Sequence, residues 1–150
     1  MNAIKKTMKT MLGVTLLEIM LVLAIAAMII VMSIRYYQSA SSSQQANAIM
    51  EQVQAIVAGA DSLAQSSGSY ASANLSANLK TLLPSNAMAA PWGGTITITG
   101  ATASTYVINI PNPPTAVCLL LTTRIKVNNH FTAGTCATGS PLTLTYTANP

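Results

Sequence analysis

The order of hydrophobic and polar residues divides this chain of 150 residues into three regions. The first reads VTLLEIMLVLAIAAMIIVMSI, an apolar run from Val14 to Ile34 in which Glu18 is the single charged residue. After a polar stretch at 39–45, apolar residues return at steps of three and four, which is typical of one face of an amphipathic helix. This predicted face comprises Ala46, Ile49, Met50, Val53, Ile56, Val57, Ala60, Leu63 and Ala64. The predicted opposite face carries Asn47, Glu51, Gln52, Gln54 and Asp61.

One continuous helix is predicted to include both the apolar run and the amphipathic face. Neither proline nor glycine occurs between Val14 and Val57, and Gly68 is a better C-terminal stop than Gly59. A helix from about Val14 to about Gln65 would be about 78 Å long at a rise of 1.5 Å per residue. Its first half is apolar on every side and requires lipid or other helices, whereas its second half requires a sheet or a packed domain on one side.

The third region is rich in turns and in threonine, and it predicts a small sheet. Apolar and polar residues alternate with period two at 95–99, 105–110 and 142–147, and a loop containing Gly100 separates the first two segments, as in a hairpin. Because alternation leaves each strand with one wetted face, the pattern fits an antiparallel sheet packed on a helix. The predicted fold class is therefore α+β, with a long N-terminal helix packed on a small antiparallel sheet.

Shorter elements are predicted between these strands. Leucines at 75–83 indicate a short helix that ends at Pro84, and the segment 91–94, Pro-Trp-Gly-Gly, indicates a turn in which the tryptophan packs rather than serves as a ligand platform. Thr115 is expected to cap a short helix that continues to about Arg124. The apolar residues of that last segment are also compatible with a buried strand.

The apolar run is long enough to cross a membrane. About 21 residues span about 31 Å as a helix, which matches the hydrocarbon thickness of a bilayer. Lys5, Lys6 and Lys9 precede the run and favour a cytoplasmic N-terminus, so the rest of the chain should lie across the membrane. The run is longer than a secretory h-region and no A-x-A-like site follows it closely, so we expect it to be retained.

Glu18 is the unusual residue of this run. A carboxylate near the middle of a bilayer costs about 2.5–3.5 kcal/mol on insertion scales. A simple anchor would have leucine or alanine there, so we expect Glu18 to meet a cationic partner within the membrane. The alternative is a snorkelling or protonated carboxyl group without a partner.

The net charge gives no general case for nucleic-acid binding. The formal charge is +4, but Lys5, Lys6 and Lys9 all precede Gly13. In the rest of the chain, four Lys and Arg residues face three carboxylates, which leaves a balance of +1.

The two cysteines, Cys118 and Cys136, suggest a disulfide, because an even number is usual in an exported domain. The bridge would close a loop of about 19 residues and contribute about 3 kcal/mol in the chain-entropy model. Two buried free thiols are the alternative if the orientation in the membrane is reversed.

The sequence contains no arrangement of residues that indicates catalysis, and we expect no enzyme activity, no cofactor and no metal site. His130 is the single histidine, and it has no acid close to it in the sequence. The cysteines are too far apart for a CxxC redox motif, and no P-loop, GxGxxG or GxSxG pattern occurs. Arg124, Lys126 and His130 could form a basic patch for DNA or acidic glycans, but a solvated edge is the preferred interpretation.

The N-terminal residues carry a family resemblance. Lys5-Lys6-Thr7-Met8-Lys9-Thr10-Met11-Leu12-Gly13, followed by Val14-Thr15-Leu16-Leu17-Glu18, resembles the processing site of type IV pilins and pseudopilins. The resemblance implies that a prepilin peptidase cleaves after Gly13 and methylates the new N-terminal amine of Val14. It also implies that Glu18, the fifth residue of the mature chain, pairs with the Val14 amine of a neighbouring subunit in a filament.

The same resemblance implies a domain organisation and a set of partners. Residues 1–13 would be a leader, 14–35 the transmembrane and polymerisation helix, 36–67 its amphipathic half, and 68–150 a globular head with a C-terminal disulfide loop. The expected partners are copies of this chain in a helical homopolymer, the prepilin peptidase, the assembly platform and the inner membrane. The precursor would reside in the bacterial inner membrane, and the mature subunit in an extracellular pilus.

Several positions depart from common family patterns. Val14 replaces the usual Phe or Met, and Arg35 occupies a position where many pilins of the type IVa group have a proline. The short leader resembles the type IVa group, but the absence of that proline, the Thr-rich C-terminal region and the Pro-Trp-Gly-Gly turn resemble type IVb pilins. The segment 131–150 contains no Asp or Glu, which disfavours the calcium-binding loop of major pseudopilins.

Two other functions stay open at this point. One is a pseudopilin of a type II-like secretion system or a minor pilin. The other is a membrane-tethered binding module that never polymerises.

Overall fold

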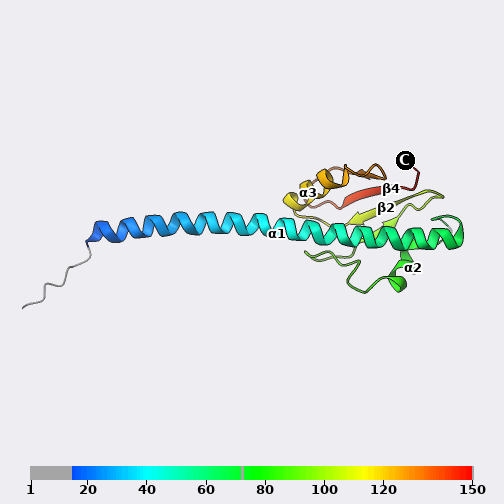
Figure 1. The fold of residues 1–150 in the computed structure, drawn as a ribbon, viewed down its shortest axis with the longest axis horizontal. Helices are drawn as coiled ribbons and strands as arrows, with labels where there is room; N and C mark the ends of the chain where they lie inside the picture. Colours follow the sequence, from blue (N-terminus) through cyan, green and yellow to red (C-terminus); the bar gives the residue numbers. More distant parts are fainter. Residues whose placement is uncertain (1–14, 72, 150) are drawn as a thin grey trace, which may run out of the picture. The chain divides into compact units, whose positions relative to one another are not determined.

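The computed structural model describes residues 15–71 and 73–149. Contacts within the chain divide it between Gln38 and Ser39 into an N-terminal unit and a C-terminal unit. Helix α1, Leu16–Ser67, contributes residues to both units, and all other helices and strands belong to the C-terminal unit. Figure 1 shows the course of the chain through these elements.

The prediction of one helix from the apolar run to Gly68 is confirmed. Helix α1 has 52 residues, and Gly68 follows its last residue with a φ of 81°. That left-handed conformation suits glycine, and the Gly68 N–H donates a 2.7 Å hydrogen bond to the carbonyl of Ala64.

The C-terminal unit contains a four-stranded antiparallel sheet of order β1-β2-β4-β3. Its strands are β1 (Thr97–Thr99), β2 (Thr105–Ile110), β3 (Phe131–Ala133) and β4 (Leu142–Thr147). The three strands expected from alternation are present, although the first is shorter than its pattern. β3 was not predicted, because three residues are too few to show a period.

The two other helices are α2 (Leu75–Leu82) and α3 (Thr115–Ile125). α2 ends before Pro84, as predicted. The expectation that Thr115 caps α3 is wrong: the cap position is Pro114, no side chain bonds the helix start, and Thr115 is the first helical residue. The alternative interpretation of this segment as a buried strand is also wrong. The segment is helical, and the Cys118 N–H donates to the Pro114 carbonyl in the first turn.

The core lies between the sheet and the C-terminal part of α1. Alternate residues of β2 and β4 point inward in register, with Tyr106 opposite Tyr146, Ile108 opposite Leu144 and Ile110 opposite Leu142. The buried residues of α1 are Ala46, Ile49, Val53, Ile56 and Ala60. Leu79 of α2 and Leu121 of α3 join the same cluster. The α+β fold predicted from periodicity is therefore confirmed.

The predicted polar face of α1 is not uniformly exposed to solvent. Glu51 and Gln54 are exposed, as expected. In contrast, the Gln52 amide donates to the carbonyls of Asn86 (3.2 Å) and Ala89 (2.9 Å), which attaches the segment after α2 to the helix.

Asn47 is exposed, as expected, whereas Asp61 is half-buried, and both side chains contact other parts of the C-terminal unit. Asn47 accepts a hydrogen bond from Arg124, and Asp61 accepts one from Tyr70. The sequence pattern places these residues opposite the main apolar stripe, but the head extends around the helix far enough to reach them.

Trp92 fixes the turn at 91–94. Its indole N–H donates a 2.6 Å hydrogen bond to the carbonyl of Pro111, and its ring packs half-buried against the core. This agrees with the expected packing role.

Candidate functional site

The first candidate site is the apolar surface of the N-terminal unit. Its large apolar side chains between Leu16 and Ile34 are each 50–76% exposed. Within the described residues, α1 is the one helix long and apolar enough to cross a membrane, and none of its most apolar window is buried. Because water does not stabilise a continuous apolar surface of this size, the segment requires lipid or other apolar helices as its surroundings.

Glu18 lies in the first turn of this helix and is exposed. Its backbone N–H donates to the carbonyl of Thr15 at 3.0 Å and to the Thr15 hydroxyl at 3.3 Å. Thr15 therefore caps the helix, and its spacing to Glu18 is that of the T-x-x-E capping box. A carboxylate in the first turn is also stabilised by the positive end of the helix dipole.

Thr15 was not among the predicted functional residues, although its T-x-x-E spacing to Glu18 is a sequence signature of a helix start. In the part of the chain that the structure describes, Glu18 forms no ion pair. Gly13 and Val14 lie outside the described residues, as do Lys5, Lys6 and Lys9. Cleavage after Gly13, methylation of Val14 and pairing of Glu18 with the Val14 amine therefore stay predictions.

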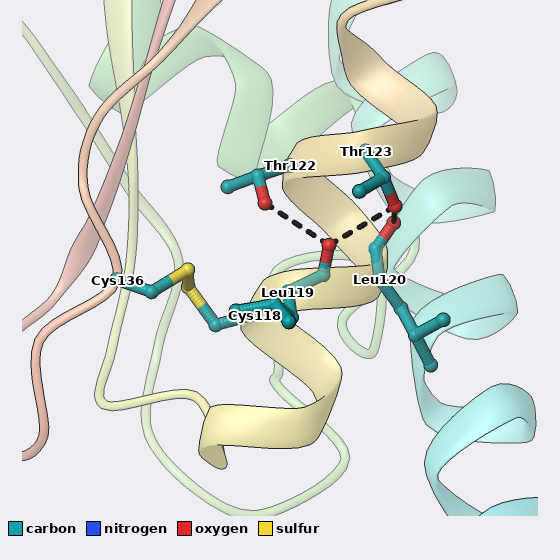
Figure 2. Close-up of a disulfide and its surroundings, with 6 residues drawn as sticks. All are labelled: Cys118, Leu119, Leu120, Thr122, Thr123 and Cys136. Carbon is teal, nitrogen blue, oxygen red and sulfur yellow. Dashed lines mark hydrogen bonds between the residues drawn. A yellow bond between two sulfur atoms is a disulfide. The ribbon is translucent and has the colours of Figure 1, made fainter.

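A disulfide between Cys118 and Cys136 links α3 to the segment that precedes β4 (Figure 2). The two Cα atoms are 5.9 Å apart, within the usual range for a bridge, and Cys118 is only 2% exposed. Farther along α3, the hydroxyls of Thr122 and Thr123 each donate a 3.0 Å hydrogen bond to the Leu119 carbonyl (Figure 2). The C-terminal disulfide loop expected from the sequence is present.

A cluster of tyrosines surrounds the C-terminal end of α1. The Tyr70 hydroxyl donates to Asp61 at 2.6 Å, and the rings of Tyr70 and Tyr146 each lie 5.0 Å from the ring of Tyr106. Burial raises the pKa of all three tyrosines above the ordinary value, and the nearby Asp61 carboxylate raises each further. Neutral tyrosines held beside a carboxylate stabilise the packing of the head and provide no nucleophile at neutral pH.

Of the three residues of the possible basic patch, Arg124 and Lys126 are exposed and His130 is half-buried. Arg124 donates to Asn47 on α1, whereas His130 bonds the Thr147 carbonyl through Nδ1 at 2.8 Å and stacks on Tyr146. His130 therefore packs against Tyr146, and the exposed Arg124 and Lys126 fit the solvated edge that the sequence favours. No group of three or more His, Cys, Asp and Glu residues in the described parts of the chain could hold a metal ion.

An exposed apolar helix, continuous with the helix of a small α+β head that carries a C-terminal disulfide, is characteristic of a pilin. The comparison with family models agrees: the model described as PilS N terminal matches residues 43–149, more than two thirds of the chain. The chain belongs to this family, and thus to the type IV pilins. No curated protein matches it.

The match and the apolar surface are separate observations. The matched residues fall within the C-terminal unit and exclude the whole apolar run. Membership of the family therefore rests on the C-terminal unit, including its part of α1. The exposed apolar segment with its single carboxylate is an additional observation from the same chain.

Proposed function

We propose that this pilin is the structural subunit of a type IV pilus of the IVb group, made as an inner-membrane precursor and polymerised through the N-terminal half of α1. Membership of the family supports the general role of a structural pilin subunit. The observation that supports the full proposal is Glu18, a lone carboxylate in the first turn of α1 among large apolar side chains that are exposed from Leu16 to Ile34.

The first step of the proposed pathway is processing in the membrane. The Lys-rich residues before Gly13 hold the N-terminus on the cytoplasmic side, where the prepilin peptidase cleaves after Gly13 and methylates the amine of Val14. Cleavage creates a new positive charge four residues before Glu18. The precursor had no charge at that position, so processing creates the partner that Glu18 requires.

The second step is assembly. The assembly platform moves the subunit from lipid into a filament, where the apolar surface contacts the same surface of neighbouring copies. A carboxylate unpaired in a low-dielectric core is strongly disfavoured, and removal of one partner from a buried pair costs about 3–5 kcal/mol. Pairing of Glu18 with the Val14 amine of a neighbour therefore makes one axial register more favourable than the others.

Glu18→Gln tests this proposal with little change of shape. The neutral variant should enter the membrane normally, because a carboxamide is less costly there than a carboxylate. Loss of a pairing worth about 3–5 kcal/mol should reduce the yield of sheared fibres by more than about tenfold. The matched control is Glu51→Gln, which neutralises an exposed carboxylate farther along the same helix and should leave fibre yield unchanged.

The outcomes separate the proposal from its rivals. Fibres at parental yield from Glu18→Gln would contradict the pairing. A binding activity retained by a Glu18→Gln chain that never leaves the membrane would indicate a tethered binding module. Fibres that contain this chain only as a trace component, or no surface fibres at all, would indicate a minor pilin or a secretion pseudopilin.

A further inference from the structure

Three residues mark the end of the apolar surface of α1. Arg35 is the first cationic residue after the run, and Tyr36 and Tyr37 follow it directly. The two tyrosine side chains are 79% and 74% exposed, although both are large and mostly apolar. The polar residues 39–45 follow directly after Gln38.

The spacing of these residues distinguishes a ring from a stripe. Consecutive residues of a helix point about 100° apart, so Arg35, Tyr36 and Tyr37 surround more than half of the helix within an axial height of about 3 Å. A face that packs on a protein uses steps of three and four, as α1 itself does between Ala46 and Ala60. Side chains that surround the helix at one height are better suited to the planar surface of a membrane than to a protein that contacts only one face of the helix.

The height of this ring agrees with the thickness of a bilayer. From Leu16 to Arg35, α1 rises about 29 Å, and a typical hydrocarbon core is about 30 Å thick. Tyrosine is enriched at membrane–water interfaces because its ring is amphipathic, and arginine extends its guanidinium to phosphate groups. Ser33, just inside the ring, donates its hydroxyl to the Ile29 carbonyl at 2.8 Å, so it needs no water at that depth.

We propose that Arg35, Tyr36 and Tyr37 form an interfacial girdle that contacts phospholipid headgroups on the far side of the membrane and fixes the depth of the precursor helix. This rests on the membrane-inserted precursor of the proposed function. The girdle has a consequence for Glu18, which lies about 17 residues, or about 26 Å, from Arg35. With the girdle at one interface, Glu18 lies near the opposite headgroups rather than at the bilayer centre, where a charge costs most.

Cysteine accessibility in the full-length chain tests the girdle. Ser39, Ser41 and Ser43 are replaced by cysteine one at a time, and intact cells are treated with a membrane-impermeant maleimide. Cys118 and Cys136 are joined in a disulfide, so their failure to react reports that the head is folded. In the parent, we expect labelling to begin at the first position after the girdle.

The test variant is Arg35→Ala/Tyr36→Ala/Tyr37→Ala, which lengthens the apolar segment and removes its boundary. Its first labelled position should move by about one helical turn, about 5.4 Å, toward Ser43. The matched control replaces three exposed polar residues of α1 outside the girdle, Gln44, Glu51 and Gln54, with alanine and should leave the boundary in place. Tyr36→Trp/Tyr37→Trp retains interfacial rings and should also keep the parental boundary.

Three results would overturn the girdle. An unchanged boundary in the alanine variant shows that these residues do not set the depth. An unchanged boundary combined with lost fibre assembly assigns the tyrosines to a neighbouring subunit instead. Release of the parent chain from membranes by alkaline extraction overturns both the girdle and the membrane step of the proposed function, and so is distinguishable from the other two.

Discussion

The Tyr70 hydroxyl lies 2.6 Å from the Asp61 carboxylate and donates a hydrogen bond to it. This contact ties the last turns of α1 to the segment that follows the helix. Tyr106 packs against Tyr70 at 5.0 Å between ring centroids, but its buried hydroxyl has no hydrogen-bond partner within the described chain. The Tyr70 hydroxyl therefore has a hydrogen-bond acceptor, whereas the neighbouring Tyr106 hydroxyl has no partner within the described chain.

We predict different effects of removing these two hydroxyls. Tyr70→Phe should lower the free energy of unfolding by about 1–2 kcal/mol, because it removes a hydrogen bond to a charged acceptor. Tyr106→Phe should be neutral or stabilising, because it removes a buried polar group without a partner in the chain. Urea unfolding of the two variants measures this difference, and a loss of more than about 1 kcal/mol in Tyr106→Phe would contradict it.

The same cluster predicts that the head loses stability at alkaline pH. Burial, with a further contribution from Asp61, raises the pKa of Tyr70, Tyr106 and Tyr146 above their ordinary value of 10.0, and in an unfolded chain they regain that value. The raised pKa therefore contributes stability that is complete below pH 10 and declines as the pH rises above it. The slope is at most about 1.4 kcal/mol per pH unit for each proton that the folded head retains and the unfolded chain has lost.

Urea unfolding at a series of pH values above 10, with tyrosinate absorbance recorded in parallel, measures this slope. Tyr106→Phe provides the control, since it should reduce the slope by the contribution of one proton. A free energy of unfolding that stays constant across the range would contradict the argument.

The disulfide is predicted to stabilise the head and to order the segment it encloses. Reduction, or the double variant Cys118→Ala/Cys136→Ala, should lower the free energy of unfolding by about 3 kcal/mol for a loop of this length. Amide hydrogen exchange should accelerate mainly between 118 and 136, because β1 and β2 pair outside the loop. Equal exchange of this segment with and without reductant would count against the prediction.

Gly59 is predicted to be required by packing rather than by backbone conformation. A Cβ atom at this position would lie 2.7 Å from Cδ2 of Leu79, whose side chain is fully buried and cannot move aside freely. Gly59→Ala should gain helix propensity of about 1 kcal/mol but lose about 1–3 kcal/mol to overpacking, for a net destabilisation of up to about 2 kcal/mol.

Ala58 offers the matched position for this test, since it is exposed on the same helix turn. Ala58→Gly should cost about 1 kcal/mol, the contribution of helix propensity alone. Thermal unfolding of both variants separates the two effects. A Gly59→Ala protein more stable than the parent would show that α2 moves to accept the methyl group.

Elements with a clear period could be predicted from the sequence. α1 was predictable because neither proline nor glycine interrupts the chain between Val14 and Val57, and because its buried face repeats at steps of three and four. β2 and β4 were predictable because buried and more exposed residues alternate along each of them. In these elements the local pattern and the final packing agree.

Features that depend on how distant segments meet could not be predicted. The contacts of Asn47, Gln52 and Asp61 depend on how far the head extends around α1, which the period of the helix does not encode. β3 forms because β4 offers a free edge to Phe131–Ala133, a partnership between segments rather than a local pattern.

The candidate functional residues also include features that the sequence shows and features that it does not. The charge of Glu18 and its apolar surroundings are visible in the sequence, whereas its proposed partner belongs to another copy of the chain. Pairing of the two cysteines followed from their even number and the expected export, and the geometry of α3 then accommodates the bridge.

The measurement that tests the central claim most directly is the intact mass and N-terminal residue of the chain from sheared surface fibres and from inner membranes. The proposed function predicts a surface species that begins at N-methylated Val14, present in bulk in the fibres. A species that begins at Met1 and stays in the membrane of cells with an active prepilin peptidase would contradict processing and polymerisation together.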